Sequence, residues 1–148
     1  VNRLQFYPTE FLTWNDIDHL QASGHEIGSH TMDHFNLAEL SEYAIKDDLS
    51  TSLEIIKNKC GSAKHFAFPF DRFHHFTKEA KNICFEVGYH SCATAERGCH
   101  INHPTPLKPE DLCILRDHIV LDWDMSHILY FLANNVRQAT ASHNLYPY

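Results

Sequence analysis

The sequence lacks a long apolar run and any cluster of basic residues. No apolar stretch approaches the roughly 20 residues that a membrane-spanning helix needs, so a membrane span is not expected. Lys and Arg number 12 against 19 Asp and Glu, for a net charge of −7, and the basic residues are scattered. We therefore expect neither a nucleic acid nor an anionic membrane as a partner, because both need a concentrated positive surface.

The N-terminal residues also lack the apolar segment of a signal peptide, and the chain has no C-x-x-C pair and no internal repeat. Its cysteines are odd in number: Cys60, Cys84, Cys92, Cys99 and Cys113. Such a set favours free thiols in a reducing compartment, with buried thiols packing as small apolar side chains. The chain does not start with Met, so export stays open; the compartment is left unknown, and the cysteines lean toward the cytoplasm.

The sequence has the length and the hydrophobic content of one domain. Its 148 residues, 43% of them hydrophobic, are enough for one core. We therefore expect a single domain over residues 1–148. The chain also holds thirteen histidines. At that frequency a pair spaced H-x-x-x-H is expected about once by chance, so this spacing alone does not identify a metal site.

Helix and strand signals alternate along the chain. Helices are expected at 13–23, at 42–58, after Thr77, and from 124 or 126 onward with Ile128, Leu132, Val136 and Ala139 inward. Strands are expected at 25–29, 64–70, 89–94 and 112–121, with a loop at 95–111. This order predicts an α/β fold of parallel strands. Functional loops then lie at the carboxyl ends of the strands.

The segment 24–34, with the sequence G-H-E-I-G-S-H-T-M-D-H, organises the rest of the chain. His30 and His34 are four apart, so on a helical turn they would face one another and bind one ion. Thr31 and Asp33 are placed to hydrogen-bond the ligands. Asp33 would point about 100° away from His34 on such a turn, which disfavours direct ligation. We predict that His30 and His34 bind a divalent metal, with zinc favoured.

The same segment closely resembles the G-H-E-I-G-S-H-T-x-x-H motif of NodB-type polysaccharide deacetylases, a family similar to carbohydrate esterase family 4. Residues 66–71, F-A-F-P-F-D, stand where that family has F-A-[YF]-P-[YF]-G. Residues 87–94 resemble its G-Y-x-x-A-x-T strand, and residues 114–116 take the place of an L-P-R segment found in one branch. The matches keep the family's order over residues 12–120.

The resemblance implies a distorted (β/α) barrel and a metal-dependent hydrolase that removes N-acetyl groups from an N-acetylated saccharide or polysaccharide. In that family two histidines and an aspartate hold the ion, and a metal-bound water attacks the amide carbonyl. His30 and His34 match the histidines, and the backbone N–H of Phe70 matches the donor to the oxyanion. A second aspartate is the family's general base, and a distant histidine is its general acid.

The chain departs from the family at four points. The T-F-D-D-G strand that supplies both aspartates is not in the 148 residues, so we expect an N-terminally incomplete barrel. Ala67 replaces the arginine of an R-x-P-Y version, Asp71 replaces a glycine, and no L-x-H motif identifies the general acid. General base and acid are therefore unassigned. Asp71 is a candidate for the third metal ligand or for a substrate contact. Arg116 is a candidate for an ion pair, either with a carboxylate of the site or with a neighbouring residue.

Three functions stay open at this point. The chain is a deacetylase, an inactive NodB-like module that binds a saccharide or a protein, or a histidine-rich metal-storage domain. The absent aspartates and the substitutions support the second function, but we favour the first for the parent protein. With two of three metal ligands and no base in the sequence, we expect weak metal affinity and little hydrolysis from these 148 residues. The absent edge strand also predicts association between chains.

Overall fold

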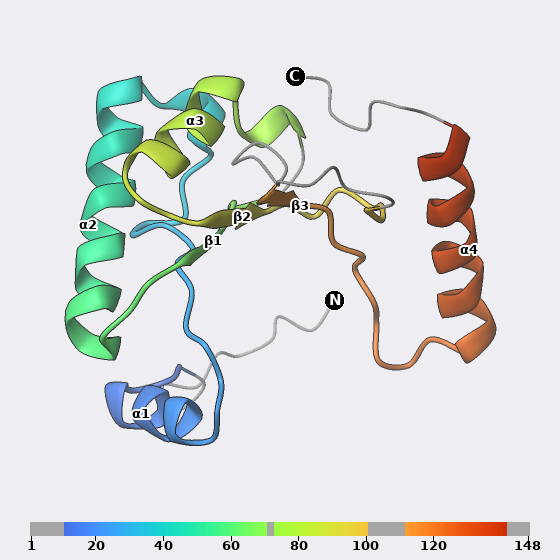
Figure 1. Cartoon of the computed structure of the whole chain (residues 1–148), viewed down its shortest axis with the longest axis horizontal. Helices are drawn as coiled ribbons and strands as arrows, with labels where there is room; N and C mark the ends of the chain where they lie inside the picture. Colours follow the sequence, from blue (N-terminus) through green and yellow to red (C-terminus); the bar gives the residue numbers. More distant parts are fainter. Residues whose placement is uncertain (1–10, 71–72, 101–111, 142–148) are drawn as a thin grey trace, which may run out of the picture.

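A computed structural model describes residues 11–70, 73–100 and 112–141 of the chain. Helices and short strands alternate along it (Figure 1), and η denotes a short 3-10 helix. The elements are, in chain order, α1 (Trp14–Ala22), η2 (Leu37–Glu39), α2 (Glu42–Cys60), β1 (His65–Ala67), η3 (Phe73–His75), α3 (Lys78–Glu86), β2 (Ser91–Ala93), β3 (Cys113–Ile114) and α4 (Met125–Ala141).

The first three α-helices begin at capping residues. Thr13 and Asp16 form a capping box at α1, in which each side chain accepts the other's backbone N–H. Ser41 and Thr77 cap α2 and α3 by accepting N–H groups of the first turn. Gly61 ends α2 with a φ of 77°, a left-handed conformation that glycine adopts without a steric penalty. The three helices predicted from these signals are confirmed.

The three strands form a parallel sheet in the order β1, β2, β3. On the free side of β1, Ser29 makes one parallel bridge: its N–H donates to the His65 carbonyl and its carbonyl accepts from Ala67, both at 2.8 Å. Gly28 permits this approach, because a Cβ there would lie 2.9 Å from the His65 carbonyl oxygen. The α/β fold with parallel strands is confirmed. Within the described residues the sheet consists of these strands and this bridge, and it does not close into a barrel.

The core lies where α2 and α3 cover the sheet (Figure 1). Phe66 and Phe68 pack edge to face with ring centroids 5.0 Å apart, and Phe68 stacks on Phe76 at 4.1 Å. These phenylalanines therefore serve the core. The other residues of this cluster are Leu37, Ile45, Leu49, Ala80, Ile83, Cys84, Tyr89, Cys92 and Cys113.

Three thiols belong to this core. The hydrogen bond with Cys92, together with burial, raises the pKa of the Cys113 thiol. Burial blocks access to all three thiols, and the reactive thiolate is also disfavoured at Cys92 and Cys113. Cys84, Cys92 and Cys113 are therefore expected to resist iodoacetamide at a pH of about 8 until the protein unfolds. The partly exposed Cys60 and Cys99 should react in the native state. Peptide mass spectrometry measures both rates, and native labelling of Cys113 as fast as that of Cys60 would contradict the prediction.

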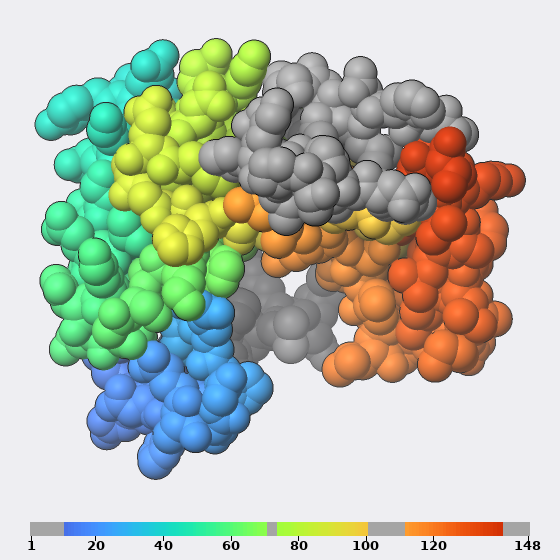
Figure 2. Space-filling view, in the orientation of Figure 1, coloured from blue at the N-terminus to red at the C-terminus, as the bar shows by residue number. Residues whose placement is uncertain are grey.

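The C-terminal part differs from the prediction. The strand expected at 112–121 is limited to Cys113–Ile114, because the polar residues that follow bond to other loops; the N–H of Arg116, for example, donates to the Glu96 carbonyl. α4 lies at the other end of the molecule from α2 (Figure 1), and with the loop before it forms a separate lobe (Figure 2). The burial implied by the predicted inward stripe is not found at Leu132 and Val136, which are 46% and 49% exposed, whereas Ile128 and Ala139 are partly buried.

The outer surface of α4 is apolar. Its exposed large side chains are Met125, Leu129, Tyr130, Leu132 and Val136. Among the residues of α4 whose exposure is described, the buried one is Asn135, whose side chain bonds to the loop after β3. In the described part of the chain, no helix has both the length and the apolar character needed to cross a membrane. The association between chains predicted from the sequence stays a prediction.

Candidate metal and catalytic site

His30, His34 and Phe70 lie together at the carboxyl ends of neighbouring strand segments. The two histidines follow the Ser29 bridge and Phe70 follows β1, and loops at this edge of a parallel sheet commonly carry function. The ring centroids of His30 and His34 are 4.8 Å apart, and those of His34 and Phe70 are also 4.8 Å apart. All three residues are exposed. The structure therefore brings three residues named from the sequence into one open site.

The ring of His30 is oriented by the sheet. Its Nδ1 lies 2.8 Å from the backbone carbonyl oxygen of Ala67 in β1. Because a carbonyl oxygen only accepts, Nδ1 carries the hydrogen and Nε2 of the neutral ring has the free electron pair. Metal-binding histidines usually make this kind of bond with the nitrogen that does not face the metal.

The two histidines approach each other through a strained loop and not through the helical turn that the sequence predicts. Thr31 has a φ of 69° and His34 a φ of 57°, and Phe70 across the site has a φ of 58°. Positive φ values are uncommon in residues other than glycine, and they concentrate at functional sites. The Thr31 hydroxyl accepts the backbone N–H of His34 at 3.0 Å. Thr31 therefore stabilises the loop itself.

Side chains from α2 hold this loop, and the sequence did not single them out. The carboxylate of Asp48 accepts the backbone N–H of Met32 at 3.2 and 3.3 Å to its two oxygens. Burial raises the pKa of the Asp48 carboxyl. One turn later, Ser52 bonds the hydroxyl of Ser29 at 3.0 Å. In the sequence Asp48 is one of several polar residues off the apolar stripe of its helix, so spacing alone does not distinguish it from Asp47.

The other candidate residues take different places. Asp33 is exposed, and its backbone faces the Asp48 carboxylate. Asp71 lies outside the described residues. Arg116 donates from Nε to the Thr94 carbonyl at 2.8 Å, which places its side chain between the loops after β2 and β3. Roles for these three residues in a metal or substrate site stay predictions.

The donor set fits part of a divalent metal site. Two imidazoles are ligands that zinc favours, and the His30 ring already has its second nitrogen bonded. In residues 11–70, 73–100 and 112–141, however, no three His, Cys, Asp or Glu side chains are grouped closely enough to hold an ion. The described residues therefore supply two ligands and leave the third unassigned.

The ring contacts continue past Phe70 to a buried histidine nitrogen. The rings of Phe70 and His75 have centroids 5.3 Å apart. The Nδ1 atom of His75 is buried, and it has no hydrogen-bond partner in the described part of the chain. Buried nitrogens usually have a hydrogen-bond partner. The His75 nitrogen is therefore a second unusual feature of this region, next to the positive φ of Phe70.

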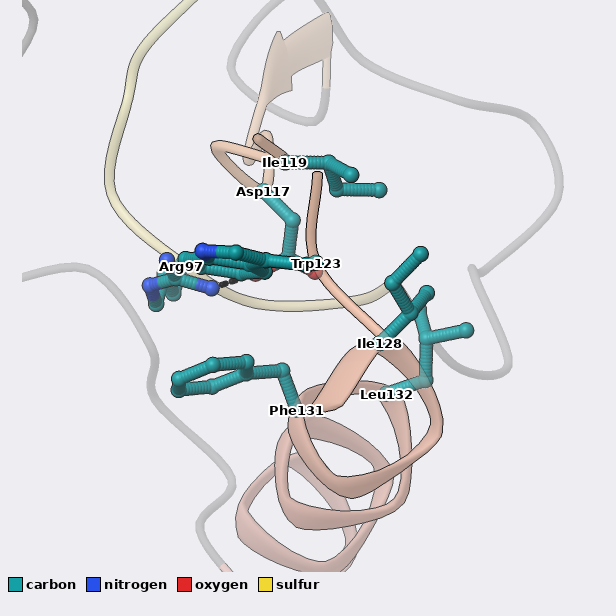
Figure 3. Close-up of a pocket in the computed structure, with 7 residues that line it drawn as sticks. All are labelled: Arg97, Asp117, Ile119, Trp123, Ile128, Phe131 and Leu132. Atoms are coloured by element: carbon teal, nitrogen blue, oxygen red, sulfur yellow. Dashed lines mark hydrogen bonds and ion pairs between the residues drawn. The ribbon is translucent and has the colours of Figure 1, made fainter. Parts of the chain in front are cut away.

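A separate pocket lies where α4 meets the loops after β2 and β3 (Figure 3). It is lined by Arg97, Asp117, Ile119, Trp123, Ile128, Phe131 and Leu132. Arg97 pairs with Asp117 at 3.2 Å and its guanidinium lies 4.1 Å from the ring centroid of Phe131. Asn135 donates to Asp117 at 2.6 Å. Because both charged side chains bind neighbouring residues, we interpret this pocket as the place where α4 attaches.

Comparisons with known proteins are consistent with this geometry. Residues 5–92 match a family model described as polysaccharide deacetylase. No match was found among the curated proteins.

Two solved structures share the fold. A de-N-acetylase from Aggregatibacter actinomycetemcomitans has a TM-score of 0.66 and 18% identity, over 88% of this chain and 58% of its own. The Streptococcus pyogenes deacetylase PplD, in complex with acetate, has a TM-score of 0.66 and 16% identity, over 81% of this chain and 50% of its own. The chain thus covers 58% and 50% of the lengths of these two proteins, and at such identities the likeness shows the fold alone.

Proposed function

Because the chain belongs to the polysaccharide deacetylase family, we propose that it hydrolyses the amide bond of an N-acetylated saccharide or polysaccharide. The observation that carries the proposal is the meeting of His30, His34 and Phe70 in one open site at the carboxyl edge of the sheet. The Streptococcus pyogenes neighbour is in complex with acetate, the acid that such a hydrolysis releases. The described strands would then belong to a distorted (β/α) barrel.

In this proposal His30 and His34 hold a divalent ion, with zinc favoured. Bound there, the ion would polarise the amide carbonyl and lower the pKa of a coordinated water. The bond from His30 Nδ1 to Ala67 keeps the ring oriented and leaves Nε2 available to the ion. A third ligand and a general base are needed in addition, and Asp71 stays a candidate for the ligand.

Phe70 contributes through its backbone. Among the described residues no backbone carbonyl accepts its N–H, and the preceding Phe68 is tied to β2 by a 3.0 Å bond to the Ala93 carbonyl. An N–H held in this way can donate to the oxygen that gains negative charge when water attacks the amide. The exposed position of Phe70 suits a polymer lying across the site.

The proposal is tested by measuring acetate released from N-acetylglucosamine oligosaccharides, with and without added zinc. We expect slow release that requires the ion and that falls to background in His30→Ala and His34→Ala. A matched control is His25→Ala, an exposed histidine five residues before His30. Release that is the same in all four proteins would contradict the proposal.

One observation favours a second function, which is saccharide binding without hydrolysis. The described residues hold no complete set of metal ligands, so the site could bind a sugar without an ion. Equilibrium binding of the same oligosaccharides decides between the two functions. Affinity that is unchanged in the His30→Ala, His34→Ala double variant, with no acetate release by the parent, would favour the binding module.

A further inference from the structure

We propose that Asp48 is a positioning residue that holds the loop bearing His30 and His34, and so raises the affinity of this pair for a divalent ion. The inference rests on the proposed function, because it concerns the same two histidines. Asp48 belongs to α2, fourteen positions after His34 in the sequence. It acts on the site through the backbone of the loop.

Asp48 contacts the backbone between the two histidines. Its two oxygens lie 3.2 and 3.3 Å from the backbone nitrogen of Met32. The backbone of Asp33, the next residue, also faces this carboxylate and favours its ionised form. Hydrogen bonds to an ionised acceptor are stronger than those between neutral groups. A half-buried carboxylate therefore anchors the middle of the loop.

The loop needs such an anchor because its conformation is unfavourable by itself. Thr31 and His34 both have positive φ values, and Met32 and Asp33 are the two residues between them. Residues other than glycine persist in this region only when their surroundings hold them there. Asp48 bonds the first of these two intervening residues, so it stabilises the backbone on which the position of the His34 ring depends.

α2 is a suitable base for this anchor. The residue after Asp48 is the fully buried Leu49. Ser52 lies four positions after Asp48, on the same face of the helix. Ser52 bonds Ser29 at the start of the loop, while Asp48 bonds its middle. One rigid helix thus sets the loop at two points, before His30 and between the two histidines.

The test compares Asp48→Ala and Asp48→Asn with Asp47→Ala, which removes the same charge from the neighbouring exposed position. Two quantities are measured: the zinc affinity, by calorimetric titration, and the hydrogen-exchange rates of the Met32 and Asp33 amides in metal-free protein. In Asp48→Ala we expect a roughly tenfold loss of zinc affinity and faster exchange at both amides. Asp48→Asn keeps an acceptor oxygen, so its zinc affinity and its amide exchange rates should lie between those of Asp48→Ala and the parent. Asp47→Ala should have the zinc affinity and the exchange rates of the parent.

The outcomes separate this inference from the proposed function. Zinc affinity or amide exchange in Asp48→Ala equal to that of the parent would overturn the positioning role. Equal losses in Asp47→Ala would also overturn it, because they would show an effect of charge alone. A parent protein that does not bind zinc would overturn the metal site itself, and that result is visible before any variant is made.

Discussion

Alanine in place of His30 or His34 is expected to weaken zinc binding on the order of 100-fold. Loss of a residue that only supports a ligand typically costs 10 to 100-fold, and each of these substitutions removes one of the two imidazoles themselves. Histidine adopts positive φ more readily than most residues other than glycine, so His34→Ala does not relieve the backbone strain at the φ of 57°. Calorimetric titration with zinc measures the affinity.

The control for this prediction is His25→Ala. His25 is exposed, lies in the same segment and has the same ring, but it precedes the Ser29 bridge. Its loss should leave the zinc affinity unchanged. If His30→Ala and His25→Ala bind zinc as tightly as the parent, the ion is held elsewhere and the assignment of these ligands is wrong. If all three variants are weakened alike, binding depends on the number of histidines in the chain, as in a metal-storage domain.

The position of the candidate site was predictable, because it depends on local sequence. Strand signals end just before His30 and at Phe70, and parallel strands place such ends at one edge of the sheet. The conformation of the loop was not predictable in the same way. The helical turn expected for His30 and His34 gives way to positive φ values at Thr31 and His34. The side chain that bonds this loop, Asp48, comes from a different element.

The same difference between local and long-range causes applies to the fold. α1, α2 and α3 were predicted because their caps and apolar stripes lie within each helix. The orientation of α4 was not predicted, because it depends on two residues from distant loops. Arg97 lies against the ring of Phe131, and Asp117 accepts a hydrogen bond from Asn135. An apolar stripe shows that a helix face can be buried. Whether it is buried depends on which other elements of the fold pack against the helix.

Phe68→Ala is expected to lower the free energy of unfolding by about 3–5 kcal/mol, the usual loss for a buried phenylalanine. Phe68 is fully buried, with its ring stacked on Phe76 at 4.1 Å and edge to face with Phe66 at 5.0 Å. Alanine would leave a cavity among these rings. Because domains are stable by only about 5–15 kcal/mol, urea denaturation should detect a large shift in the midpoint.

The size of this loss tests the packing next to the site, since Phe68 is two residues before Phe70. Phe35→Ala is the control, because the Phe35 side chain is 53% exposed and its removal should cost less than about 0.5 kcal/mol. Phe68→Leu serves if the alanine variant does not fold; it keeps most of the volume and should lose less than the alanine variant. A loss for Phe68→Ala as small as that for Phe35→Ala would show that the rings of Phe66, Phe68 and Phe76 do not form the core between the sheet and its helices.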